Sequence, residues 1–96
     1  MIGRLLGRIF GPRGPRTVVG EEVVYGRYRI TPTPFEQEGR WITAGVIVLE
    51  TEEGRREHRF VRADSHLTAE DALEFSVIKA KQIIDQMGEH LFDLPS

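Results

Sequence analysis

The hydrophobic period of the sequence changes near residue 68. From Val23 to about Ala63, apolar and polar residues alternate with period two, which is typical of β-strands. From about Ala69 to Met87, apolar residues recur at the spacing of an α-helix. The chain has 96 residues, enough for one modest core and too few for two. The sequence therefore predicts one α+β domain over residues 21–96.

The alternating region predicts three antiparallel strands: a first strand that includes residues 24–31, with a candidate break near Gly26, and whose end region Pro32 and Pro34 mark as an edge, a second over residues 41–50 and a third over residues 56–63. The segments 37–39 and 52–54 each end in glycine and are typical of three-residue hairpin loops, in which glycine supplies a left-handed conformation. In this register Glu50 lies opposite Arg56, an attractive pair. The expected sheet is a three-stranded meander packed against one long C-terminal helix.

This register assigns the strand residues to two faces. The face expected to pack on the helix carries Tyr28, Ile30, Ile42, Ala44, Val46, Val48, His58 and Phe60. The face expected to be open carries Arg27, Arg29, Thr31, Thr33, Phe35, Trp41, Thr43, Ile47, Leu49, Arg59 and Val61.

The helix has clear end signals. Thr68 is the expected N-cap, and Glu70 and Asp71 place carboxylates in the first turn, where the helix dipole favours them. Gly88 is the expected stop. The stripe expected to face the sheet consists of Ala72, Leu73, Ser76, Ala80, Ile83, Ile84 and Met87.

The N-terminal 20 residues form a basic arm, with Arg4, Arg8, Arg13, Arg16 and no acid, whereas residues 21–96 hold 9 basic and 15 acidic residues. Apolar residues within 1–10 predict a short amphipathic helix, followed by a Gly/Pro-rich linker up to Gly20. Such a short helix needs a surface: its own domain, a second subunit, or a membrane surface contacted by residues 1–10. Alternatively, the arm contacts DNA.

Composition excludes several function classes. The chain has no cysteine, which excludes disulfide scaffolds and thiolate metal sites and fits a reducing compartment such as the cytoplasm. The longest apolar run, residues 46–49, is far shorter than the roughly 20 residues of a membrane-spanning helix. We therefore expect a cytoplasmic protein without an integral membrane span.

Catalytic and metal motifs receive little support. The histidines His58, His66 and His90 lack the spacing that aims two ligands at one metal ion. Residues 64–66 (Asp-Ser-His) are consecutive, so their side chains diverge and do not form a catalytic triad. No phosphate-binding loop or nucleophile elbow is present. The sequence predicts neither an enzyme nor a cofactor or metal site.

The expected open face has two interpretations. Arg27, Arg29 and Arg59 near Trp41 resemble a nucleic-acid surface, with arginines for phosphates and an aromatic ring for stacking. The other interpretation is a protein interface, in which the apolar side chains pack on the N-terminal helix or a second copy; its residues are Ile47, Leu49, Val61 and Trp41.

Four segments resemble the HlyU family of small bacterial transcriptional activators. They are residues 30–34 (ITPTP), Trp41 with residues 43–47 (TAGVI), residues 58–64 (HRFVRAD), and residues 74–76 (EFS) with 79–85 (KAKQIID), in matching order. The resemblance implies a single-domain cytoplasmic bacterial protein that regulates transcription.

Taken together, we expect a non-enzymatic regulator that contacts DNA through the arm arginines and Arg27, Arg29 and Arg59, with Trp41 as a stacking surface. The alternative is an interaction module that forms a homodimer or binds another regulatory protein without touching DNA.

Overall fold

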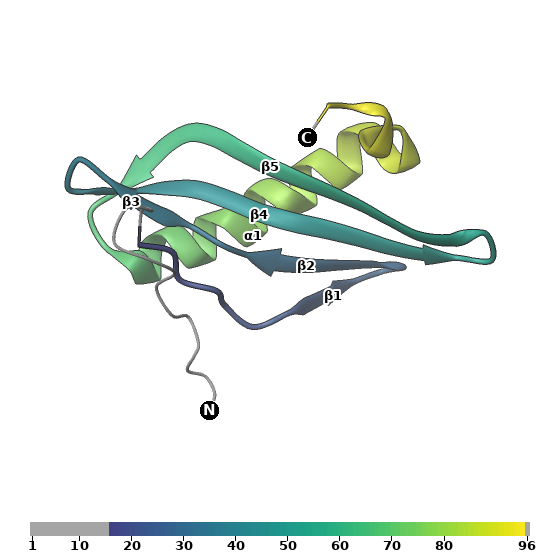
Figure 1. The fold of residues 1–96 in the computed structure, drawn as a ribbon, viewed down its shortest axis with the longest axis horizontal. Helices are drawn as coiled ribbons and strands as arrows, with labels where there is room; N and C mark the ends of the chain where they lie inside the picture. The colour runs from purple at the N-terminus through teal and green to yellow at the C-terminus, as the bar shows by residue number, and fades with distance from the viewer. Residues whose placement is uncertain (1–15, 96) are drawn as a thin grey trace.

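A computed structural model describes residues 16–95 and shows an antiparallel sheet of five strands with one long helix across one face (Figure 1). The elements in chain order are β1 (Val23–Tyr25), β2 (Tyr28–Pro32), β3 (Phe35–Gln37), β4 (Arg40–Thr51), β5 (Gly54–His66), α1 (Ala69–Met87) and the 3-10 helix η1 (Gly88–Asp93). The α+β class and the long C-terminal helix are confirmed. The expected N-terminal helix within residues 1–10 lies outside the described residues.

The expected first strand is a hairpin. Gly26, with φ of 62°, forms part of the turn between β1 and β2, and β3 follows two prolines, Pro32 and Pro34. Both β2 and β3 pair with β4 in one continuous register, so they occupy successive parts of the same side of β4. The sheet therefore has five strands, and the expected three-stranded meander is wrong.

Residues 16–20 extend the sheet beyond β2 and β3. The backbone N–H groups of Val18 and Gly20 donate to the carbonyl oxygens of Pro34 and Pro32, at 3.0 and 2.9 Å. The expected linker thus runs along the sheet from Arg16 onward. These two prolines lack an N–H but keep their carbonyl acceptors, which suits them to this pairing.

Both hairpin registers differ from the expectation by one residue. Gln37 pairs with Arg40 across a two-residue turn, in which Glu38 and Gly39 have φ of 54° and 81°. Such a turn needs left-handed conformations at both positions, which glutamate seldom adopts. In the second hairpin Thr51 pairs with Gly54.

These two shifts invert the faces of the central strand alone. Ile47 and Leu49 point toward α1 and are 0% and 1% exposed, while Val46 and Val48 lie on the open face. The side chains of β2 and β5 lie on the faces expected for them, because each one-residue register difference changes only which β4 residues lie opposite. The helix-side positions expected for Ile42, Ala44, Val46 and Val48, and the open-face positions expected for Trp41, Thr43, Ile47 and Leu49, are therefore wrong, although Ala44 and Val48 are buried, at 3% and 6% exposed.

The helix begins and ends where the sequence indicates. Thr68 Oγ1 accepts a hydrogen bond from Asp71 N at 3.1 Å, and Gly88 caps the C-terminus with φ of 57°. The buried helix residues come from the predicted stripe: Ala72, Ser76, Ala80, Ile83 and Ile84. Three of them, Ala80, Ile83 and Ile84, belong to the core cluster, which also contains Ile30, Ile47 and Phe60 from the sheet and fully buried Leu91 from η1.

Candidate functional site

The open face of the sheet, opposite α1, is built from three rows of side chains that cross the strands. The registers align Arg29, Val48 and Glu57 in one row and Thr31, Val46 and Arg59 in the next. The third row contains Thr33, Ala44 and Val61. Basic side chains thus lie on β2 and β5, the two strands that flank β4, with apolar side chains of β4 between them.

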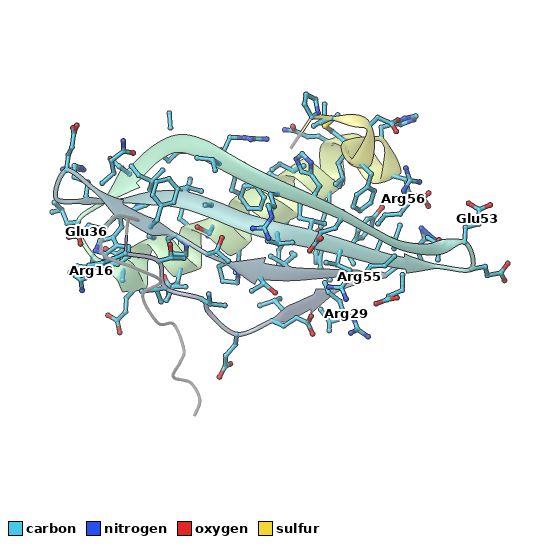
Figure 2. The ribbon with its side chains drawn as sticks, in the orientation of Figure 1. Arg16, Arg29, Glu36, Glu53, Arg55 and Arg56 are labelled. Carbon is cyan, nitrogen blue, oxygen red and sulfur yellow. The ribbon has the colours of Figure 1, made fainter. Side chains whose placement is uncertain are left out.

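Three exposed arginines on this face make no side-chain hydrogen bond or salt bridge among residues 16–95: Arg29 from β2 and Arg55 and Arg59 from β5; we refer to them as the open-face arginines. Figure 2 shows Arg29 and Arg55 at the end of the sheet that carries the β1–β2 and β4–β5 turns. At the far end, Arg40 donates from Nε to Ser65 Oγ at 3.0 Å.

Acidic residues are concentrated away from this face. The described residues include 10 basic and 15 acidic side chains, and two of these acids, Glu50 and Glu57, lie on the open face within β4 and β5, with Glu50 directly opposite Arg55. Helix α1 carries Glu70, Asp71, Glu74 and Asp85 against two basic residues, Lys79 and Lys81. Helix α1 therefore has more acidic than basic side chains, whereas the open face of β2, β4 and β5 has more basic than acidic ones.

The open face also contains a largely apolar depression of about 410 Å³, whose lining includes the basic side chain of Arg59. Its lining includes Val19, Phe35, Val46 and Val61, and Val19 and Val61 are 53% and 56% exposed. Val61 therefore lies where the sequence placed it, on the open face.

Several other predicted site residues are engaged elsewhere. Arg27 forms an ion pair with Glu89 at the C-terminal end of the fold. Arg16 lies 3.1 Å from Glu36 and its guanidinium carbon lies 5.9 Å from the ring centre of Trp41. Trp41 is only 9% exposed, so its ring is not available as a stacking surface.

Two further predictions have different outcomes. Ile47 and Leu49 belong to the core beneath α1, which removes them from any surface that a partner could reach in this fold. Arg4, Arg8 and Arg13 lie outside the described residues. The structure places a further arginine, Arg55, on this surface, and the sequence did not predict it. With a two-residue β4–β5 turn, β5 starts early enough to include Arg55.

Comparison with known families gives one match. The family model described as transcriptional activator HlyU matches residues 4–92. The chain belongs to the HlyU family. No curated protein and no solved structure matches it. The open face described above is therefore the surface of a protein from a transcriptional-activator family.

In this HlyU-family chain, the consecutive residues Asp64, Ser65 and His66 have three separate partners. Asp64 lies 3.6 Å from Lys79 Nζ, Ser65 accepts from Arg40, and His66 Nε2 lies 3.2 Å from Thr43 Oγ1. The divergence predicted for this segment is confirmed, because no two of these three side chains hydrogen-bond to one another.

The described part of the HlyU-family chain contains no group of three His, Asp or Glu side chains that could hold a metal ion. Among the same residues, no helix is long and apolar enough to cross a membrane.

His58 is a buried titratable residue on the helix-facing side of β5. It is 3% exposed, and within residues 16–95 its Nδ1 atom has no hydrogen-bond partner. Burial, and secondarily the positive charge of Arg62, lower the pKa of His58 below its ordinary value of 6.5. The neutral imidazole is thus favoured in the folded state.

We expect stability to fall as the pH drops below about 6.5, because the unfolded chain then binds a proton that folded His58 binds less readily. The stability is fully present above the unfolded pKa and is lost as the pH falls toward the lower folded pKa. His58→Leu should flatten this dependence and keep neutral-pH stability within about 1 kcal/mol of wild type or above it, since it removes an unpaired buried nitrogen.

Thermal unfolding followed by circular dichroism between about pH 8 and pH 5 measures this effect. His90→Gln, at a histidine whose side chain is 86% exposed, is the control and should retain the wild-type dependence. Equal slopes for wild type and His58→Leu would contradict the assignment.

Proposed function

We propose that this protein is a non-enzymatic transcriptional regulator that contacts DNA phosphates through the open-face arginines Arg29, Arg55 and Arg59. One observation carries the proposal: these exposed guanidinium groups share one face of the sheet, and no described carboxylate lies within salt-bridge distance of them, although Glu50 is the cross-strand partner of Arg55. Membership of the HlyU family supports the regulatory part.

The chemistry of the face suits backbone contact. Guanidinium groups bind phosphate oxygens in bidentate geometry, and such contacts orient a protein on a duplex without reading its sequence. Glu57 lies in the same row as Arg29, which limits the attraction. Binding through this face alone is therefore weak and depends strongly on salt.

The test is fluorescence anisotropy of a labelled duplex titrated with the full chain at about 50 and 200 mM salt. Three phosphate contacts should weaken binding by at least about 40-fold between these concentrations. The variant Arg29→Ala/Arg55→Ala should lower the slope of log affinity against log salt by roughly 2.

Arg56→Ala is the matched control. Arg56 neighbours Arg55 in the sequence but points to the other side of the sheet, where it lies 3.8 Å from Asp93 and over the ring of Phe92. Its removal should leave DNA affinity unchanged. Absence of binding at 50 mM salt, or an equal loss in Arg56→Ala, would overturn the proposal.

A second candidate function rests on the apolar depression. The exposure of Val19 and Val61 beside Phe35 favours a protein partner on that part of the face. A regulator that binds no DNA in the anisotropy experiment would act through this surface.

A further inference from the structure

Strand β5 forms one margin of the sheet (Figure 1). Within residues 16–95, it pairs with β4 alone, although it is 13 residues long. One side of its backbone therefore presents N–H and C=O groups that another strand could join. Its pairing with β4 is regular over residues 54–61, and the irregularity follows, between the pairs Ala44–Val61 and Ile42–Ser65.

A groove runs beside this margin. It has a volume of about 550 Å³ and is lined by residues 58–62 of β5 together with Leu94 and Pro95. His58, with its buried and unpartnered Nδ1, lies in this lining, as does half-exposed Val61. The centre of the regular β5 segment thus combines an unpaired backbone edge, an apolar groove and an unsatisfied nitrogen.

The charges along this segment are arranged so that β5 complements itself. Two antiparallel copies related by a twofold axis at His58 place Glu57 of each copy opposite Arg59 of the other. The same register places Arg56 opposite Phe60 and Arg55 opposite Val61, so no like charges meet. An axis at Glu57 or at Arg59 would instead set that residue against itself.

We infer that the free edge of β5 binds the β5 edge of a second copy of this chain, forming a twofold-symmetric dimer with a continuous ten-stranded sheet. The ladder covers residues 55–61, all within the regular part of the strand. Two Glu57–Arg59 pairs fix its register on the open face. Neutral His58 side chains meet at the axis on the helix side, where each groove is closed by the other copy.

Formation of the dimer would change which arginines can contact DNA, but the dimer does not require DNA binding. Arg59 pairs with Glu57 across the axis, so Arg29 and Arg55 of both copies remain on one enlarged face. Oligomeric mass and DNA affinity are separate measurements, and the Arg29→Ala/Arg55→Ala variant retains the Glu57–Arg59 pairs. Failure of one inference is therefore distinguishable from failure of the other.

Sedimentation equilibrium of the full chain tests the dimer, with an expected mass about twice the monomer's 10.9 kDa. Glu57→Arg and Arg59→Glu should each raise the dimer dissociation constant at least about tenfold, because each replaces two attractive pairs with two repulsive ones. The double variant Glu57→Arg/Arg59→Glu should recover wild-type affinity, since opposite charges again face each other.

A second pair of variants changes shape as well as charge. Val61→Arg places a cation opposite Arg55 of the other copy and should also weaken the dimer. Val24→Arg is its control, because Val24 is 68% exposed on β1, at the opposite edge of the sheet, and this change should leave the dimer affinity unchanged. Circular dichroism establishes that each variant is folded. A monomer at all concentrations, a dimer insensitive to the charge reversals, or a double variant that fails to recover would overturn the inference.

Discussion

Ile47→Asp is expected to unfold the domain. Ile47 is 0% exposed, lies in the middle of β4 and packs in the core cluster with Ile30, Phe60 and Ala80. The substitution removes a large apolar side chain and buries a carboxylate without a partner, which together cost at least about 4 kcal/mol. Because a domain of this size has a total stability of roughly 5–14 kcal/mol, most or all of it is lost.

Val46→Asp is the matched control, since Val46 is the preceding residue on the opposite, open face. It should cost less than half as much, because Val46 is only partly buried and borders Arg59 in its row. Urea unfolding of both variants measures the difference. A stable Ile47→Asp with an unfolded Val46→Asp would show that β4 has the opposite orientation.

Gly45→Val is expected to destabilise the fold by about 2–3 kcal/mol through overpacking. A Cβ atom at Gly45 would lie 2.8 Å from the Phe60 ring and 3.0 Å from the backbone oxygen of Thr31. The Phe60 ring belongs to the buried core cluster, and the oxygen belongs to the adjacent strand β2, so neither can move away freely. Phe60 thus covers the space that the missing side chain of Gly45 leaves on β4.

The midpoint of urea denaturation measures this loss. Gly45→Val combined with Phe60→Leu separates the two contacts, because the smaller side chain relieves the contact with the ring and leaves the contact with Thr31. The two changes should therefore be non-additive, with the double variant more stable than the sum of the single effects. Additive effects would contradict a direct Gly45–Phe60 contact.

The helix was predictable because its signals are local. Thr68, the acidic first turn and Gly88 lie within one turn of the helix ends that they specify, and the structure places the ends at Ala69 and Met87. The burial stripe follows from the same 3.6-residue period.

The orientation of β4 was not predictable in this way. Residues 44–49 are apolar on both faces, apart from Gly45, so period two does not distinguish the core side from the open side. Charge pairing was equally uninformative, since Glu50 meets an arginine whether Arg55 or Arg56 lies opposite. The left-handed Glu38 in the first turn has no sequence signature comparable to Asn-Gly.

The candidate surface was therefore predicted in part. Arg29 and Arg59 were placed correctly because β2 and β5 kept their expected faces. The expected placement of Trp41 on the open face was wrong, because it depended on the orientation of β4. Arg27 is held by Glu89, 62 residues away in the sequence, a contact that no local pattern indicates.

The order of elements along the chain has a consequence for biosynthesis. All five strands lie within residues 23–66, and each pairs with a neighbour in the sequence, whereas α1 begins only at Ala69. The sheet can therefore assemble hairpin by hairpin without closing a long loop. Until the last third of the chain leaves the ribosome, Ile30, Ile47 and Phe60 face solvent. The growing polypeptide is thus most prone to aggregate after β5 has been synthesised and before α1 has packed on the sheet.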